Sequence, residues 1–471
     1  LGRRGKPTRG GRRSWRRGTR NPSPTSARKR RRANPTRPSA RGAEAASEQA
    51  LLAESFPTFA TVVSISAPAP PAALTPAAIP YDALWQPTAR QQVDAWLHRA
   101  AAAMRALDAG QRAAPPASLV IPAREALQPF AAPHIWDCRD PARCVRLAAS
   151  SAKHPPSSSL SPAFVAAAAR TLAWPDADVV RQVASGAEDG AAACDHAIML
   201  CFHHKGLQAR FADARAAVAT DADAGFIALG YSHLPFLPIR LVPRNVAVQV
   251  KWSVESDGSL SSREKPRLTT DDSWDVSGTV TSRNAAITQA GLPELQLPSA
   301  RDLARAAAII LTAARAAGVP ARAYARDLSA AYRAWGVQAL SLWLQCFLWL
   351  GGLGVDTRLV FGTASAPQLF QRLTSLLAAL AAHRQRAWDA AHPPRNAALL
   401  AWLHAREAAG LPATLGYLQV FLDDATGVAV DDREDDWPEG RAAAHFAIVG
   451  DVFAAAGFTL ALPKDQLGLN V

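Results

Sequence analysis

The sequence predicts an α+β fold in which an antiparallel sheet is flanked by helices. Strand-like segments rich in aromatic and β-branched residues occur at 239–254 and 417–422. A helix with a serine N-cap and a glycine stop is predicted at 299–318. Helices and strands do not follow the regular alternation that a parallel sheet requires. The 471 residues, 49% of them hydrophobic, suffice for about two to four domains with a large core.

The first 43 residues carry the basic charge of the chain. They hold 16 of the 52 Lys and Arg and no Asp or Glu, whereas the rest of the chain has 36 basic against 39 acidic residues. Because this tail has almost no apolar side chain and many Gly and Pro, we expect it to be disordered. Its Arg-rich stretch at 28–32 indicates phosphate binding or nuclear targeting, and the alternative is an idle flank.

Two regions follow before the character of the sequence changes near residue 238. Residues 44–130 are rich in Ala and Pro, which is typical of a linker, and contain a predicted helix at 88–110. Residues 131–237 contain helical segments such as 162–173 and suggest no particular chemistry.

Cysteine usage favours a reducing compartment, nucleus or cytoplasm. The five Cys, at 138, 144, 194, 201 and 346, are too few and too irregular for a disulfide framework. A zinc site could be drawn from Cys138, Cys144, Cys194 and His203, but these spacings match no strong ligand pattern, and buried thiols are the favoured alternative. The amino end shows no signal peptide. The first residue is Leu, so we expect a fragment or a processed product.

Residues 336–355 form an uncharged run of 20 residues, which is the length of a membrane span. Gln338 and Gln345 interrupt this run, and the sequence LGGLG near its end suits a turn. We therefore expect a buried hairpin and no membrane partner.

The carboxyl-terminal half predicts a series of short elements. In chain order these are a hairpin at 239–272 with a long polar tip at 255–266, the helix at 299–318, an extended run that turns helical after Asp327, the uncharged hairpin, a helix with Pro367 in its first turn, a capped helix at 396–410, a hairpin around Asp423, a helix at 441–457, and a final strand and turn.

Three acids stand out by their position. Asp423 and Asp424 lie among turn-forming residues between two apolar runs, so we expect them at a hairpin tip. Adjacent like charges cost free energy unless a cation offsets them. Asp327 ends another extended run. Carboxylates at two strand ends suit Mg²⁺, and two ions about 3.5–4 Å apart can hold the attacking and leaving oxygens of a phosphoryl transfer. Each motif alone is more often a solvated turn.

The order and spacing of several motifs resemble the palm of reverse transcriptases. "ARDLSAAY" is similar to the first palm motif, "FGTASAPQLFQRL" to the second, "YLQVFLDDA" to the third and "AAAGFTLALPKDQLG" to the fourth. Upstream, "VQVKWSVESDGSLSSREKPRLTTDDS" is similar to the fingers hairpin. The resemblance covers residues 240–471 and is strongest to retroelements of the retrovirus, Gypsy and DIRS types. It implies a right-hand polymerase palm with fingers, at 238–471.

The resemblance also implies roles for the acids and for one lysine. Asp327, Asp423 and Asp424 would hold two Mg²⁺ ions, with Mn²⁺ as an alternative, and the main-chain carbonyl of Leu328 would be a further ligand. Lys464 matches a lysine that protonates the pyrophosphate leaving group, which is a general-acid role.

Further positions would contact the nucleotide. Tyr332 falls where the family excludes a ribose 2′-hydroxyl, although a core tyrosine would suit the same position. Lys251 and Arg267 fall where fingers residues bind the triphosphate, and each alone would suit a solvated surface. The implied partners are an RNA or DNA template-primer and deoxynucleotides, with the basic tail contacting nucleic acid.

The second motif and the carboxyl end depart from the pattern. Gly362 and Pro367 shape the loop beneath the incoming base, but Phe361 stands where retroviral enzymes have Gln. The chain ends seven residues after Lys464, without a thumb or RNase H segment, so we expect this fragment to hold a duplex poorly, and its activity alone is not predicted.

The sequence therefore predicts an RNA-directed DNA polymerase of a retroelement. The alternatives are a non-catalytic nucleic-acid-binding remnant and an RNA-directed RNA polymerase, and the aromatic ring at 332 argues against the latter. The oligomeric state is not predicted.

Overall fold

The computed structural model describes 85–126, 158–188, 190, 196–235, 238–255, 257–276, 282–287, 295, 297–432 and 440–470. The basic tail, most of the Ala/Pro-rich linker and the cysteines at 138, 144 and 194 lie outside these residues. The predictions made for them therefore stay predictions.

An antiparallel five-stranded sheet lies in the carboxyl-terminal half of the chain, as predicted. Its strand order is β10-β11-β7-β12, and β13 also pairs with β7. All of these pairings are antiparallel. The strands are β10 (Gly416–Phe421), β11 (Asp424–Val430), β7 (Ala321–Ser329), β12 (Thr459–Leu460) and β13 (Gln466–Asn470).

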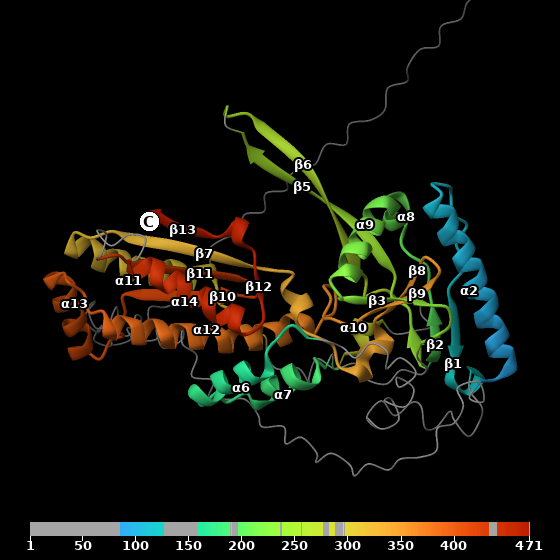
Figure 1. The fold of residues 1–471 in the computed structure, drawn as a ribbon, viewed down its shortest axis with the longest axis horizontal. Helices are drawn as coiled ribbons and strands as arrows, with labels where there is room; N and C mark the ends of the chain where they lie inside the picture. Colours follow the sequence, from blue (N-terminus) through green and yellow to red (C-terminus); the bar gives the residue numbers. More distant parts are fainter. Residues whose placement is uncertain are drawn as a thin grey trace, which may run out of the picture. The chain divides into compact units, whose positions relative to one another are not determined.

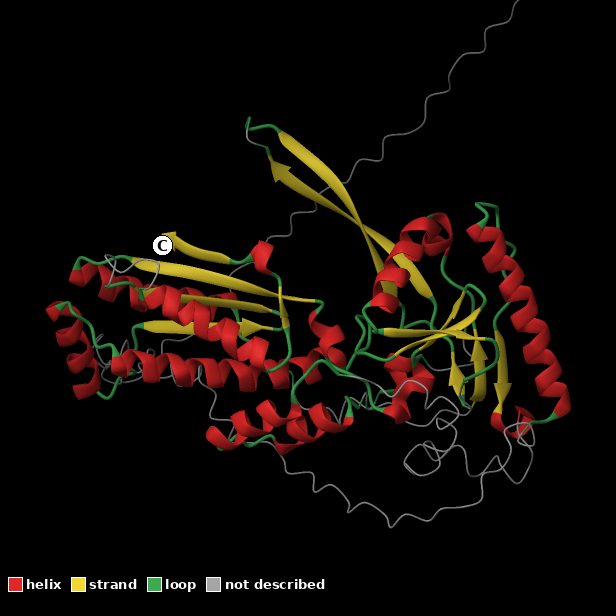
Figure 2. Ribbon diagram, viewed as in Figure 1, coloured by secondary structure: helices red, strands yellow, loops and turns green. Residues whose placement is uncertain are grey.

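Helices cover both faces of this sheet (Figures 1 and 2). They are α12 (Ala366–Ala391) and α14 (Arg441–Ala455) on one face, and α11 (Ala300–Ala317) and α13 (Ala397–Ala408) on the other. Alternation along the strands separates the two cores. Leu418 belongs to the apolar cluster that includes Phe453 of α14. Its neighbour Tyr417 belongs to a second cluster with Ile310 of α11 and Leu399 of α13.

Local chemistry explains where these helices begin and end. Ser299 and Asp302 form a capping box at the start of α11, and Gly318 ends this helix in the left-handed conformation. Asn396 accepts two backbone hydrogen bonds at the start of α13. Pro367 lies in the first turn of α12, where its missing N–H costs nothing. These predictions are confirmed.

The first hairpin is a long two-stranded ribbon of β5 (Arg244–Val254) and β6 (Leu260–Thr270). The strands pair along eleven residues each, from Arg244 with Thr270 to Val254 with Leu260. The predicted long polar tip at 255–266 is wrong, because the residues from Leu260 onward continue the ladder. The turn is short, and in "SREKPR" the basic residues Arg263, Lys265 and Arg267 recur at every second position, which is the period of a strand.

The hairpin at the two adjacent aspartates is also tighter than predicted. Asp424 is already the first residue of β11, and the turn formers after it, including Gly427, belong to the strand. Pairing with β10 on one side and β7 on the other outweighs their turn preference.

The uncharged run at 336–355 is a buried hairpin, as predicted. It contains η5 (Ala339–Leu344), β8 (Cys346–Trp349) and β9 (Gly352–Asp356), and β9 also pairs with β3 (Ile227–Tyr231). Among the described helices, none combines the length and apolarity that a membrane span requires.

The remaining described elements lie outside the five-stranded sheet and the ribbon. They are α2 (Pro87–Asp108), β1 (Leu119–Pro122), α3 (Ala123–Ala126), α6 (Pro162–Thr171), α7 (Ala177–Ser185), β2 (His196–Leu200), α8 (Lys205–Ala209), α9 (Phe211–Asp223), β4 (Ile239–Arg240) and α10 (Arg283–Ala286). The predicted helices at 88–110 and 162–173 are confirmed as α2 and α6.

Candidate active site

Asp327 and Asp424 are direct cross-strand neighbours. In the antiparallel pairing of β7 with β11, the Cα of Asp327 is the register partner of the Cα of Asp424. Directly opposed residues project from the same face of a sheet. Along β11, Val428 and Val430 share this face with Asp424 and are buried under α11. The face that is apolar at one end of the sheet is therefore acidic at the other.

Asp423 occupies the turn between β10 and β11. Its carbonyl oxygen accepts a hydrogen bond of 3.2 Å from the backbone N–H of Leu328. This bond ties the turn to the residue that follows Asp327. The three predicted acids, which come from segments almost a hundred residues apart, thus lie at one end of the sheet.

The turn is strained and needs support. Leu422 has φ of 54°, a left-handed conformation that is uncommon for a residue with a large side chain. The buried side chain of Gln371, from α12, accepts a hydrogen bond of 2.8 Å from the Leu422 N–H and donates one of 3.1 Å to the Val420 carbonyl. Gln371 therefore holds the backbone on both sides of Phe421 and fixes the direction of Asp423.

Burial and neighbouring carboxylates raise the pKa values of Asp423 and Asp424. Partial burial, followed by the nearby charge of Asp327, raises the pKa of Asp423. Loss of solvent, the charge of Asp423 and a hydrogen-bonding contact with Asp327 raise the pKa of Asp424. Both shifts mean that the folded chain disfavours a full set of negative charges here. A cation at this place would remove that penalty.

Lys464 supplies one such cation. It ends the short 3₁₀ helix η7 (Leu462–Lys464), and its ammonium group forms an ion pair with the Asp327 carboxylate. Lys464 is 59% exposed, whereas Asp327 is 16% exposed, so the lysine approaches the acid from the solvent side. An exposed pair of this kind contributes little to stability and can open when a ligand competes for either partner.

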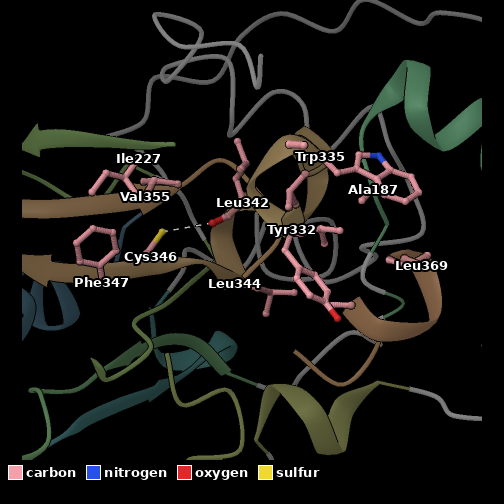
Figure 3. Packing of buried hydrophobic residues seen from close by; sticks show 14 of the residues in the cluster. Ala187, Ile227, Tyr332, Trp335, Leu342, Leu344, Cys346, Phe347, Val355 and Leu369 are labelled. Atoms are coloured by element: carbon pink, nitrogen blue, oxygen red, sulfur yellow. Dashed lines mark hydrogen bonds between the residues drawn. The ribbon is translucent and has the colours of Figure 1, made fainter. Parts of the chain in front are cut away.

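Tyr332 lies beside the acids within an aromatic cluster. It belongs to the 3₁₀ helix η4 (Ala331–Ala334), and its ring centroid lies 4.5 Å from that of Phe361 and 4.7 Å from that of Phe370. Figure 3 shows Tyr332 in the apolar packing around Trp335. Burial and the charge of Asp423 raise the pKa of Tyr332 to about 12. Tyr332 is almost fully buried, while Phe361 covers it and is itself exposed.

The loop at 361–364 is held by hydrogen bonds from Asn284. Its amide donates to the Gly362 carbonyl at 2.7 Å and accepts from the Ala364 N–H at 2.7 Å. Gly362 has φ of 116°, and a Cβ there would meet the Thr270 carbonyl at 2.4 Å. Only glycine fits this close approach to the end of the ribbon where Arg244 pairs with Thr270, which we call its root.

A buried ionic network joins the root of the ribbon to the segment after Tyr332. Arg244 at the start of β5 pairs with Asp356 at the end of β9, and Asp356 also pairs with Arg333. Arg333 pairs in turn with Asp221 of α9 at 2.6 Å. Removing one partner of a buried pair typically costs about 3–5 kcal/mol, so this network fixes where β5 leaves the core.

The ribbon carries a row of basic residues along one face. Arg263, Lys265 and Arg267 alternate on β6, and Lys251 lies opposite Arg263 on β5. Arg267, followed by the loss of solvent and by Lys251 and Lys464, lowers the pKa of Lys265, while Asp327 acts in the opposite direction. The charge of Arg267 acts to lower the pKa of Asp423, against the larger effect of burial. The basic face is thus within electrostatic reach of the acids.

Sequence reasoning missed Lys265, Gln371 and Asn284. Lys265 could have been found by reading 260–267 as a strand, because its alternation with Arg263 and Arg267 then places three cations on one face. Gln371 was recognisable only as a polar residue on an otherwise apolar face of a helix. Asn284 showed no signal in the sequence, because its partners lie about 80 residues away in the loop at 361–364.

The donor set suits a hard divalent cation. Over the described residues, no three or more His, Cys, Asp or Glu side chains are arranged to hold a metal ion together. Mg²⁺, however, is usually bound by one or two carboxylates together with substrate phosphates and water, rather than by an all-protein cage. Asp327 and Asp424 lie directly opposite each other and meet this simpler requirement. The raised pKa values of Asp423 and Asp424 indicate that a cation would be favoured at the same place.

Comparison with known proteins gives partial matches to solved structures alone. No family model and no curated protein sequence matches the chain. Native prototype foamy virus protease-reverse transcriptase is 13% identical over 68% of this chain and 33% of its own, with a TM-score of 0.32. The foamy viral enzyme in complex with an RNA/DNA hybrid is 14% identical over 57% and 25%, also with a TM-score of 0.32.

A third match is the foamy viral enzyme dRH in complex with double-stranded DNA, 15% identical over 60% of this chain and 35% of its own, with a TM-score of 0.31. This chain therefore spans a quarter to about a third of the length of these proteins. Because the TM-scores are low, we base the proposed function on the geometry of the site.

Because Asp424 lies opposite another acid, we expect Asp424→Asn to stabilise the folded protein when no divalent cation is present. The pKa of Asp424 is raised in the folded state, so its ionisation costs stability above that pKa, and the cost disappears as the pH falls through it. Because Asp424 is exposed and solvent screens its charge, we expect the free energy of unfolding at pH 8 to increase by only about 0.5 kcal/mol, the scale of a cross-strand charge pair. Urea titrations at pH 8 and pH 4 measure it.

Asp451→Asn, which neutralises an exposed acid on α14, is the matched control and should change neither titration. A loss of stability in Asp424→Asn at pH 8 would contradict the repulsion.

Proposed function

We propose that this site performs templated DNA synthesis, with the five-stranded sheet as the palm and the β5–β6 ribbon as the fingers of a reverse transcriptase. The observation that carries the proposal is the register of Asp424 with Asp327. It brings two acids together on one face, with Asp423 in the adjacent turn and Lys464 paired to Asp327. Acids, a proton donor and a basic ribbon at one place are the groups that nucleotidyl transfer requires.

Asp327 and Asp423 would hold two Mg²⁺ ions, or Mn²⁺, with Asp424 and the Leu328 carbonyl as additional ligands. Bound there, the ions would neutralise the charge that develops on the attacking and leaving oxygens. The chain's own contribution is to fix the acids: the β7–β11 ladder sets the spacing of Asp327 and Asp424, and Gln371 sets the turn that carries Asp423.

The basic face of the ribbon would bind the triphosphate of a deoxynucleotide. Arg267 offers a planar fork to phosphate oxygens, while Lys265 and Lys251 offer point charges. The Arg267 Nε donates to Gln249 Oε1 at 2.7 Å, which holds the guanidinium on this face. The buried Arg244–Asp356 pair would keep the root of the ribbon in place while phosphate binds.

Tyr332 and Phe361 would form the wall against the sugar. Their rings lie in contact, and the exposed ring of Phe361 extends the buried ring of Tyr332 towards solvent. A ribose 2′-hydroxyl placed against such a wall would clash, so the pocket would favour deoxynucleotides. Gly362 and Pro367 would form the floor under the base, held by Asn284.

Lys464 would act as the general acid. The primer 3′-hydroxyl would lose its proton to water as its oxygen forms a bond to the α-phosphorus. The bond from that phosphorus to the bridging oxygen would break, and the Lys464 ammonium would donate a proton to the pyrophosphate that leaves. Its contact with Asp327 holds it beside the acids before the reaction. The template-primer would be RNA or DNA, and the basic tail would add non-specific phosphate contacts.

Replacing Asp423 tests the catalytic assignment. We expect Asp423→Asn, which keeps the shape of the side chain, to lower the rate of primer extension by at least about 10³-fold, because the transition state loses charge stabilisation. Nucleic-acid affinity should stay within about twofold, measured by fluorescence anisotropy at fixed salt. Asp451→Asn is the control for the loss of one negative charge.

Normal extension by Asp423→Asn would rule out the role of this acid. If the unmodified chain binds template-primer but does not extend it with deoxynucleotides and Mg²⁺ or Mn²⁺, the non-catalytic nucleic-acid-binding alternative is favoured.

Replacing Tyr332 tests the sugar wall. Tyr332→Val removes the ring and should raise the ratio of kcat/KM for ribonucleotide over deoxynucleotide by about tenfold or more, because the clash with the 2′-hydroxyl is relieved. Tyr332→Phe keeps the ring and should leave the ratio unchanged. Single-nucleotide incorporation with each substrate measures both. A change of the ratio in Tyr332→Phe, or none in Tyr332→Val, would contradict a role of the ring.

A further inference from the structure

A second ion pair lies directly beside the pair of Asp327 and Lys464. Arg326 precedes Asp327 on β7, and Asp465 follows Lys464 after η7; the Arg326 Nη2 lies 3.0 Å from the Asp465 Oδ2. In the first pair β7 supplies the acid, Asp327, and in the second pair β7 supplies the base, Arg326. We call Arg326 and Asp465 the clasp.

The backbone explains why the two pairs are adjacent. β12 pairs with Leu328 and Ser329 of β7, and β13 resumes pairing at Ala325. Between them, η7 bulges out of the ladder opposite Arg326 and Asp327. The Ala461 N–H donates to the Asp327 carbonyl at 2.9 Å and marks where the bulge starts. Such a bulge re-aims side chains, and here it directs Lys464 and Asp465 to β7.

The base of the clasp is much less exposed than the base of the adjoining pair, whereas the two acids, Asp465 and Asp327, are almost equally exposed. The side chains of Arg326 and Asp465 are 9% and 15% exposed, against 59% for Lys464. The Arg326 guanidinium carbon also lies 3.7 Å from the centroid of the Phe446 ring on α14. Alternation along β7 places Arg326 on the α14 side, opposite to Asp327.

Helix α14 makes room for the clasp with a glycine. A Cβ at Gly450 would lie 1.6 Å from Arg326 Nη1, far closer than atoms can approach. Glycine inside a helix costs about 1 kcal/mol relative to alanine. Within the described structure, Arg326 Nε and Asp465 Oδ1 are buried without a hydrogen bond. A pair that leaves polar atoms unsatisfied is poorly explained as a stabilising device.

We propose that Asp465, acting through Arg326, is the positioning residue for Lys464. The clasp anchors the carboxyl end of η7, so the flexible lysine stem starts from a fixed point one residue away. Lys464 can then leave Asp327 for the pyrophosphate and return without the turn moving. This inference rests on the proposed general-acid role of Lys464, but the clasp itself can be tested without catalysis.

The first measurement is the reactivity of the Lys464 amine. The chain has only seven lysines, so competitive acylation with peptide mapping resolves each of them. We expect Asp465→Asn to raise the acylation rate of Lys464 relative to Lys205 by at least threefold, because the amine spends less time paired with Asp327. Gly450→Ala, which displaces Arg326 without changing Asp465, should do the same. Asp451→Asn is the control and should give wild-type ratios.

The second measurement is single-turnover incorporation by the same folded variants, checked by circular dichroism. Asp465→Asn should lower the maximal rate about tenfold while the half-saturating deoxynucleotide concentration changes less than twofold, and Asp465→Glu should recover part of the rate. A purely structural role would not separate rate from affinity in this way.

Unchanged Lys464 acylation in both Asp465→Asn and Gly450→Ala would overturn the clasp. Raised acylation with an unchanged incorporation rate would overturn its role in positioning a proton donor. If the wild-type chain incorporates no nucleotide, the proposed function fails, and the acylation ratios still decide whether the clasp fixes Lys464.

Discussion

The mutual repulsion of carboxylates at one end of the sheet is the constraint on which the site depends. The β7–β11 register opposes Asp327 to Asp424, and the turn adds Asp423. Partial burial, followed by the charges of the neighbouring carboxylates, raises the pKa values of Asp423 and Asp424, so water and neighbouring cations offset this charge incompletely. Lys464, Arg267 and Lys265 all act electrostatically on this group. The site therefore holds negative charge that a bound cation would offset.

Much of the fold and the acidic centre could be predicted from local signals. The caps at Ser299 and Asn396, Pro367 in its first turn and the apolar run before Asp423 each act over a few residues. These signals placed α11, α13, α12 and β10 correctly. Asp327 and Asp423 were paired through the order of motifs, since no local rule brings residues so far apart together.

The misjudged parts depend on long-range pairing. Residues 260–266 look like a polar loop, yet they form β6, because the ladder to β5 continues and exposes both faces of the ribbon. Gln371, Asn284 and the clasp of Arg326 with Asp465 act through partners 50 to 140 residues away in sequence. Composition and periodicity carry no information about such contacts.

The most direct test of this account is whether Asp327 and Asp423 bind the same divalent cation. Electron paramagnetic resonance titrations with Mn²⁺, with and without a deoxynucleotide, measure the affinity of the intact chain and of Asp327→Asn, Asp423→Asn and the double variant. We predict that each single change weakens nucleotide-dependent Mn²⁺ binding at least tenfold and that the double variant is little worse than either. Wild-type affinity in either single variant would show that the two acids do not share an ion, and the polymerase assignment would fall with it.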